Sequence, residues 1–164
     1  MRLFLRLAPL LLISAALASC AVPGAIVPNQ TSADALLKKL GTPTDTRYDP
    51  QGGELWEYAY GPEGTETWLF GIDRARMVRS ATQLLTPERL YQVVPGVTTQ
   101  AQVIALLGKP RLVTQFREES AWEWRVNLRP TLGVYVVRFG ANGLATGVNV
   151  LMDRSTDSND RGEK

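Results

Sequence analysis

Apolar and polar residues alternate in eight short segments between residues 44 and 152, a pattern typical of β-strands with one buried face. Aromatic and β-branched residues are frequent in these segments, which favours strands over helices. Connections containing Gly, Pro or Asn separate neighbouring segments and are short enough for antiparallel turns. The pattern predicts strands at residues 44–48, 54–60, 65–72, 77–85, 111–117, 121–127, 134–140 and 144–152.

An amphipathic helix is predicted ahead of each group of four strands. Leu36, Leu37 and Leu40 form one apolar stripe at helical spacing, and the second helix carries a similar stripe. Its members are Val103, Leu106 and Leu107. Gly41 and Gly108 are expected to end the two helices, because glycine tolerates the backbone conformation of a helix C-cap.

The predicted helices also have start signals. Thr31 with Asp34, and Thr99 with Gln102, stand at capping-box spacing. A further short helix is expected at residues 86–94, with Thr86 as its cap and a proline in its first turn.

The chain resembles itself at a nearly constant offset. Leu40-Gly41-Thr42-Pro43 matches Leu107-Gly108-Lys109-Pro110 later in the sequence. The segments around Trp56-Glu57 and Trp122-Glu123 match in the same order and at almost the same offset. We therefore predict an α+β fold of two tandem repeats, residues 31–85 and 86–152, each with short helices packed on an antiparallel β-meander.

The N-terminal segment has the order of a secretory signal. Arg2 and Arg6 precede an apolar run from Leu7 to Leu17, and small residues lead to Cys20. A transmembrane helix is the alternative, but the longer apolar run from Leu7 to Val22 contains Pro9 and falls short of the roughly 20 residues that span a bilayer. Residues 1–19 are predicted to be a signal peptide, residues 20–30 a lipidated tether and residues 153–164 a disordered tail.

The expected anchor is a covalent lipid on Cys20. Leu17-Ala18-Ser19-Cys20 resembles the bacterial lipobox, whose cysteine receives diacylglycerol and becomes the mature N-terminus. Ala21 follows it, where an Asp would suggest inner-membrane retention, so the resemblance implies the periplasmic face of the outer membrane.

Composition narrows the chemistry that the chain can perform. It has no histidine and only one cysteine, so the commonest general base, the commonest metal ligand and disulfides are missing. The 18 basic residues exceed the 16 acidic ones only through the two arginines of the leader, so the remainder is formally neutral. We expect no catalytic residue, no metal, no cofactor besides the Cys20 lipid, and no nucleic-acid partner.

Two groups of residues could have either a functional or a purely structural role. Glu57 and Glu123 could form a carboxylate pair for acid–base chemistry, but each alternates with aromatic neighbours, which predicts a solvated sheet face. The aromatic residues could form a binding surface, yet their alternation with charged residues favours the core. They are Trp56, Tyr58, Tyr60, Trp122, Trp124, Tyr135 and Phe139, whereas the side on which Trp68 lies stays open.

The same motifs resemble a known family. A short helix ending Leu-Leu-Gly-x-Pro, a Trp-Glu-aromatic strand and a strand ending Phe-Gly, on a lipoprotein signal, resemble the SmpA/OmlA (BamE-like) outer-membrane lipoproteins. The second repeat fits better, because it keeps Pro95-Gly96-Val97-Thr98 where the first has Val27-Pro28-Asn29-Gln30. This resemblance implies a non-catalytic binding or scaffold module with a protein partner in the cell envelope, such as the β-barrel assembly machinery.

The tandem arrangement resembles a second architecture, that of β-lactamase inhibitory protein. It implies the alternative function, a periplasmic inhibitor or sequestering protein that binds an enzyme through its sheets. Neither resemblance identifies the partner or the surface that binds it.

Overall fold

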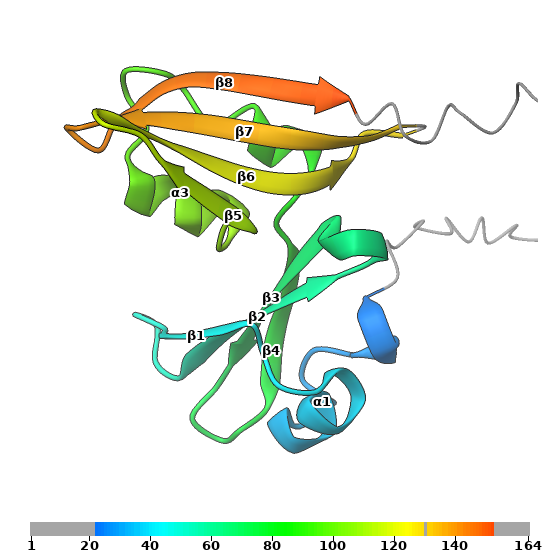
Figure 1. Cartoon of the computed structure of the whole chain (residues 1–164). Coiled ribbons are helices and arrows are strands. Elements are labelled where there is room, and N and C mark those ends of the chain that lie inside the picture. Colours follow the sequence, from blue (N-terminus) through cyan, green and yellow to red (C-terminus); the bar gives the residue numbers. More distant parts are fainter. Residues whose placement is uncertain (1–21, 130, 153–164) are drawn as a thin grey trace, which may run out of the picture.

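The computed structural model describes residues 22–129 and 131–152, which form two units that each contain a four-stranded antiparallel sheet (Figure 1). The first unit contains η1 (Pro23–Ala25), α1 (Ala33–Leu40), β1 (Asp45–Tyr48), β2 (Glu54–Tyr60), η2 (Pro62–Gly64), β3 (Glu66–Ile72) and β4 (Val78–Gln83). The second unit contains α2 (Pro87–Leu90), α3 (Gln100–Leu107), β5 (Leu112–Gln115), β6 (Glu119–Asn127), β7 (Leu132–Gly140) and β8 (Ala145–Met152). Strands are neighbours in chain order in both sheets, as in a meander.

All eight predicted strands are present, and their ends lie close to the expected ones. The helix expected at residues 86–94 is shorter, because α2 ends at Leu90. Pro95 keeps the helix from reaching Val94, since a residue before proline is disfavoured in helical conformation. Val94 instead donates its N–H to the Thr98 hydroxyl at 2.8 Å. Thr86 occupies the N-cap position of α2, but its side chain makes no capping hydrogen bond.

The two longer helices begin differently. Thr99 and Gln102 form the predicted capping box at the start of α3. The cap predicted for α1 was wrong, because the neighbouring Ser32 is the N-cap and its hydroxyl accepts the Ala35 N–H at 3.1 Å. The Thr31 hydroxyl instead accepts the Val27 N–H at 3.0 Å, which fixes the loop ahead of the helix.

Both helices end at the predicted glycines. Gly41 has φ +77° and Gly108 has φ +78°, a backbone conformation that L side chains rarely adopt. Gly41 donates its N–H to the Leu37 carbonyl at 2.8 Å, and Gly108 donates to the Ile104 carbonyl at 2.9 Å. The glycine carbonyl then accepts from an aromatic residue of the sheet. Tyr58 Oη reaches Gly41 at 3.1 Å, and Trp124 Nε1 reaches Gly108 at 3.2 Å.

The hydrogen bonds ahead of the two helices also recur at corresponding positions of the two units. Val27 and Val94 donate to the hydroxyls of Thr31 and Thr98, and Ala33 and Gln100 donate to the carbonyls of residues 76 and 143. The first unit was expected to depart from the second in this loop. Its sequence differs, but Val27 and Thr31 occupy the places of Val94 and Thr98 and make the same contacts.

Each unit has its own hydrophobic cluster. The first cluster joins residues 26, 33 and 36 to side chains of β2, β3 and β4, and the second joins Val103 and Leu107 of α3 to β6 and β7. The aromatic residues predicted as core are buried or packed against these clusters, with one exception. Tyr60 is 43% exposed, because it stands at the end of β2. Trp68, which the sequence left open, is buried in the first cluster.

Residues 22–30 lie within the predicted tether, and the structure describes them. Ile26 is buried in the first cluster, and Lys39 Nζ donates to the Gly24 carbonyl at 2.9 Å. This part of the expected tether therefore packs against the first unit. Cys20, the signal peptide and the predicted tail lie outside the described residues. No helix in residues 22–129 and 131–152 is long and apolar enough to cross a membrane.

Candidate functional site

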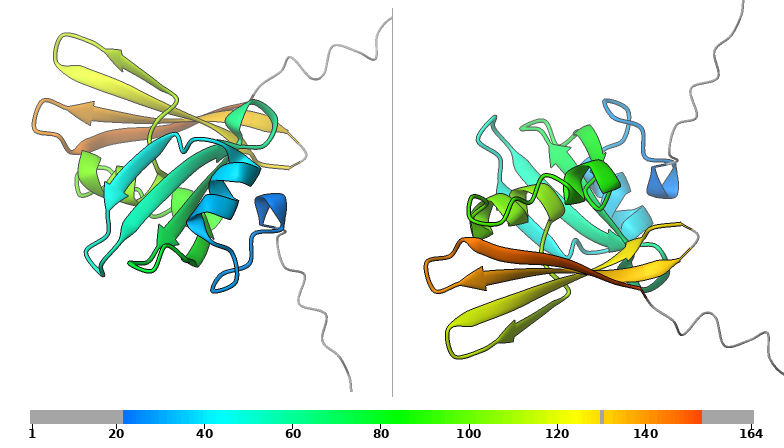
Figure 2. Two further views of the ribbon diagram at one scale, coloured as in Figure 1. Left: turned by 90° about the horizontal axis from the view of Figure 1, so that it is seen from below. Right: turned by 90° about the horizontal axis from the view of Figure 1, so that it is seen from above.

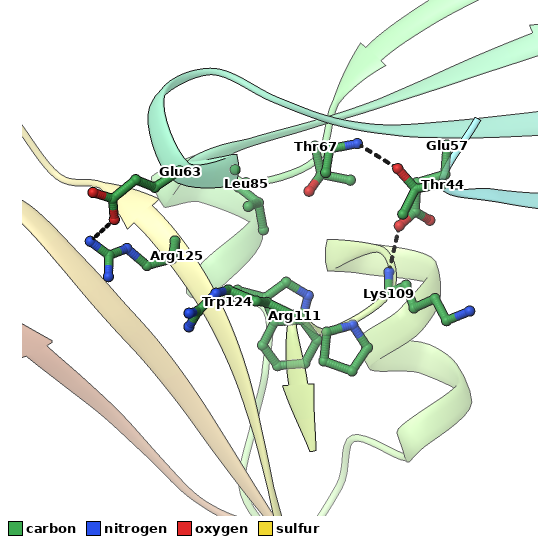
Figure 3. A pocket seen from close by; sticks show the side chains of 12 residues that line it. Thr44, Glu57, Glu63, Thr67, Leu85, Lys109, Arg111, Trp124 and Arg125 are labelled. Carbon is green, nitrogen blue, oxygen red and sulfur yellow. Dashed lines mark hydrogen bonds and ion pairs between the residues drawn. The ribbon is translucent and has the colours of Figure 1, made fainter. Parts of the chain in front are cut away.

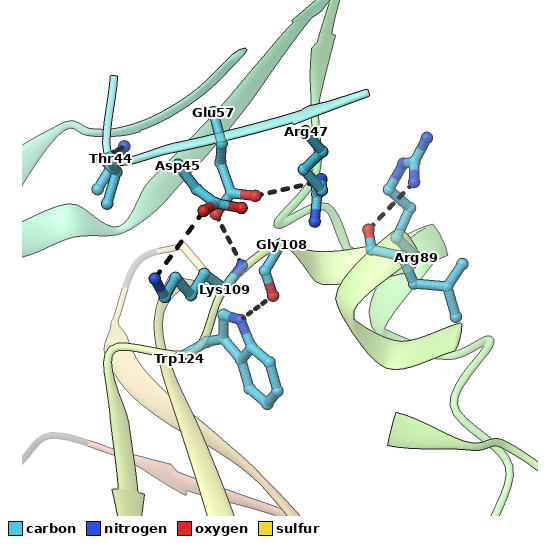
Figure 4. A network of polar contacts seen from close by, with 10 residues as sticks. Thr44, Asp45, Arg47, Glu57, Arg89, Gly108, Lys109 and Trp124 are labelled. Atoms are coloured by element: carbon cyan, nitrogen blue, oxygen red, sulfur yellow. Dashed lines mark hydrogen bonds and ion pairs between the residues drawn. The ribbon is translucent and has the colours of Figure 1, made fainter. Parts of the chain in front are cut away.

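The second unit covers the face of the first sheet that points away from its hydrophobic cluster. Strand register places Glu57 opposite Asp45 on β1 and Leu69 on β3, on the face opposite Trp56 and Tyr58. The prediction of a solvated Glu57 was wrong, because its exposed fraction is 2%. The loop formed by residues 108–110, which follows α3, lies over this carboxylate (Figure 4).

Glu57 accepts hydrogen bonds from both units. The Lys109 backbone N–H donates to Glu57 Oε1 at 2.7 Å, and Arg47 Nη2 donates to Oε2 at 3.0 Å. Lys109 Nζ also lies 3.9 Å from Asp45 Oδ1. Since both carboxylate oxygens already have a partner from this chain, Glu57 acts as a fixed acceptor that joins the two units.

Gly108 allows the close approach of the loop. A Cβ atom at this position would lie 2.8 Å from Glu57 Oε1 and 2.9 Å from Thr67 Cγ2, closer than side-chain carbons are found. The Gly108 carbonyl accepts the indole N–H of Trp124, whose ring belongs to the second cluster. One glycine therefore ends α3, contacts the first sheet and connects to the second core.

The protonation of Glu57 reflects this burial. Removal from water raises the pKa of its carboxyl, whereas the Lys109 N–H and the Arg47 charge act in the opposite direction. The nearby Asp45 charge adds to the increase. Burial is the largest of these effects, so the pKa of Glu57 lies above its ordinary value.

A cavity of about 430 Å³ opens beside this contact, between the two units (Figure 3). Glu57, Thr44 and Thr67 line it from the first unit, and Lys109, Arg111 and Trp124 line it from the second. Glu63 of η2 and Arg125 of β6 form an ion pair across the cavity rim. Positively and negatively charged residues therefore both line the cavity, and the polar contacts between the units hold its walls together.

The structure does not bring the two predicted carboxylates into one site. Glu123 lies on the outer face of the second sheet, where it pairs with Leu112 and Val136. Glu123 is half-buried, and no side-chain hydrogen bond or ion pair involves it within the described part of the chain. Among those residues, no cluster of three or more acidic or cysteine side chains could hold a metal ion.

Sequence reasoning missed the residues that complete the junction. Arg47, Lys109, Glu63 and Arg125 are separated by long stretches of chain, and nothing in their spacing indicates that they meet. The nearest signal was Gly108, which the sequence identified only as a helix end.

Comparison with known proteins places part of the chain in a family. Residues 83–149, from the end of β4 into β8, match the family model described as "Outer membrane protein assembly factor BamE domain". No curated protein matches the sequence.

Two solved structures show limited similarity. A DUF4309 family protein (YjgB) from Bacillus subtilis subsp. subtilis str. 168 is 14% identical, covers 78% of this chain and 82% of its own, and has a TM-score of 0.31. An extracellular protein containing a SCP domain from Bacillus anthracis str. Ames is 15% identical, covers 99% of this chain and 54% of its own, and has a TM-score of 0.29. At these TM-scores neither structure informs the function of this chain. The family match, together with the Leu-Gly-Lys-Pro helix end and the Trp-Glu-Trp strand, shows that residues 83–149 form a domain of the BamE-like family.

Proposed function

We propose that this protein is an outer-membrane lipoprotein that acts as a non-catalytic binding module in outer-membrane protein assembly. This proposal rests mainly on the match of residues 83–149 to the BamE domain. In this proposal a lipid on Cys20 holds the chain at the periplasmic face of the outer membrane. The two units arise from a duplication, which the hydrogen bonds repeated at corresponding positions support.

The junction supports a role as a rigid binding module. Glu57 Oε1 accepts the Lys109 N–H of the second unit, Arg47 of the first unit holds Oε2, and Arg125 pairs with Glu63 across the junction. A partner would therefore meet two units in one fixed orientation, which lowers the entropy lost on binding.

An exposed apolar surface in the matched domain is the candidate contact. Tyr91, Val94 and Val97 are exposed residues of the short segment between α2 and α3, and Tyr91 is 85% exposed. Exposed aromatic and aliphatic side chains that gather in one place are common at protein interfaces.

The anchor is tested by Cys20→Ser. We expect this variant to lose incorporation of labelled palmitate and to leave the outer-membrane fraction, because the thiol that carries the lipid is gone. Equal labelling of Cys20→Ser and the wild type would refute lipidation at this residue.

The partner is tested by crosslinking in intact cells, followed by purification from detergent-solubilised membranes. An assembly role predicts crosslinks to an integral β-barrel assembly complex that decrease in Cys20→Ser. Tyr91→Ala should lose these crosslinks and keep its stability. The control is Tyr48→Ala, at a tyrosine of the first unit that is 73% exposed, and it should keep them.

The inhibitor alternative predicts a different result. A soluble periplasmic enzyme would then be captured equally well by the wild type and Cys20→Ser, since binding would not need the membrane. That outcome would replace the assembly role with the sequestering function.

A further inference from the structure

At the centre of the contact between the two units, a loop of the second unit lies on a sheet face of the first that carries two acidic residues, Glu57 and Asp45. Loop 108–110 presents the Lys109 N–H, and the outer face of the first sheet presents Glu57 at 2.7 Å. The Lys109 side chain extends along this face toward Asp45, at 3.9 Å. Because the two units are built alike, the chain carries a second loop and a second sheet face of the same kind.

The second loop, residues 41–43, belongs to the first unit and is open to solvent. Gly41 ends α1 with nearly the same φ as Gly108, and Gly41 and Thr42 are exposed. Within residues 22–129 and 131–152, no hydrogen bond uses the Thr42 N–H, the counterpart of the Lys109 donor. A Cβ atom at Gly41 would meet nothing within 4 Å, so no described residue lies over this side of the loop.

The second sheet face belongs to the second unit. Glu123 pairs with Leu112 on β5 and Val136 on β7, as Glu57 pairs with its neighbours on β1 and β3. Figure 2 shows the helices of this unit on one side of its sheet. On the other side η2 of the first unit reaches Arg125, two residues along β6, but no described residue makes a side-chain hydrogen bond or ion pair with Glu123. Leu112, the counterpart of Asp45, is 46% exposed on this face.

We propose that a second copy of this chain docks on this face head to tail, with its loop 41–43 over Glu123. The Thr42 N–H of one copy donates to the Glu123 carboxylate of the next, and the Thr42 side chain lies beside Leu112. Such a contact joins two different surfaces of the chain. A pair of copies therefore still has a free loop 41–43 at one end and a free sheet face at the other, to which further copies can bind.

The contact between copies differs from the one within the chain. Leu112 and Thr114 replace Asp45 and Arg47, so an apolar contact takes the place of the ion pairs. The copies also lack the covalent connection that gives the units of one chain a high effective concentration. Association therefore depends on protein concentration, and it is favoured where copies are confined to a surface.

The test uses cysteines at the two positions predicted to meet, in the full-length chain made in cells. Thr42→Cys retains the backbone donor, and Leu112→Cys leaves Glu123 in place. Under mild oxidation, the double variant should give a ladder of dimers, trimers and longer species on non-reducing gels. Two single variants made together should stop at dimers, since each copy then has one reactive end.

The control pair is Thr42→Cys with Glu118→Cys, because Glu118 is exposed at the β5–β6 turn of the same unit. The wild type measures any background crosslinking through Cys20. Adding Glu123→Ala to the double variant should reduce the ladder about tenfold, the loss expected for a charge-assisted hydrogen bond.

Three results would overturn the proposal. The first is a ladder no stronger than that of the control pair. The second is a Thr42→Cys single variant that forms as much crosslinked product as the double variant. The third is a Leu112→Cys variant that crosslinks to another protein and not to this chain. Sedimentation of the detergent-solubilised wild type gives a measurement free of substitutions, and a monomer at all concentrations would also refute it. None of these outcomes depends on the proposed role in assembly.

Discussion

Replacing Glu57 with alanine should weaken the junction more than any other single loss of charge in the described chain. The Lys109 N–H would lose its acceptor while remaining covered by the first sheet, which costs about 1–3 kcal/mol for a buried donor. The loss of the Arg47 ion pair adds about 0–1 kcal/mol, because that side chain is 25% exposed and water screens it. Relief of the buried charge offsets part of this, so we expect Glu57→Ala to lower the unfolding free energy by about 1–3 kcal/mol.

The assay is urea denaturation followed by tryptophan fluorescence, together with calorimetry. Each unit contains two of the four tryptophans, so the signal reports on both. The wild type should unfold in a single transition, since the junction leaves no flexible linker between the units. Glu57→Ala should split this transition, because each unit keeps its own hydrophobic cluster.

The matched control is Glu123→Ala at the equivalent strand position. Glu123 is half-buried and makes no ion pair with any described residue, so its loss should change stability by no more than about 0.5 kcal/mol. Equal effects of the two substitutions, or a wild type that already shows two transitions, would refute the conclusion that Glu57 joins the units.

Three further predictions follow from the core and the junction. Burial raises the pKa of Glu57 in the folded protein above 4.5, the ordinary pKa of a glutamate. The stability that the protonated carboxyl contributes is therefore complete below pH 4.5 and is lost as pH rises through the raised pKa. Glu57→Gln should therefore gain stability relative to the wild type as pH increases from 4.5 toward neutral, and a difference that falls with pH would contradict this. Trp124→Ala should cost about 3–5 kcal/mol in denaturation, because it empties part of the second cluster, and an unchanged midpoint would make Trp124 a surface residue. Tyr135→Phe should cost about 1–2 kcal/mol in the same assay, since it removes the donor 2.7 Å from the Leu90 carbonyl, whereas the exposed Tyr91→Phe should cost almost nothing.

Much of the fold could be predicted because it depends on local signals. Alternation places each strand, and the two glycines with positive φ end the two helices at the expected positions. The capping box at Thr99 is equally local, since both partners lie within one turn. The cap of α1 was misplaced because Thr31 and Ser32 are both good caps, and the Val27 N–H engages the first of them.

The junction could not be predicted, because its contacts join residues that are far apart in sequence. Alternation correctly places Glu57 on the face opposite Trp56, but it cannot tell whether water or another unit covers that face. The contact partner Lys109 comes from the other unit and uses its backbone N–H, which every residue except proline possesses. No side-chain type could therefore have identified it.

The difference between Glu57 and Glu123 shows what the packing of two similar units changes physically. A small sheet with helices on one side has a second face that can remain polar in water, and both units keep a glutamate at its centre. Placing two units in one chain buries one of these faces, so its glutamate needs a donor and a cation, and Lys109 and Arg47 supply them. The second face has no Arg47 counterpart, because Thr114 takes that place. A carboxylate there is stable only if it stays in contact with water or receives a donor from outside the chain, and the Thr42 N–H of another copy is a donor of the required kind.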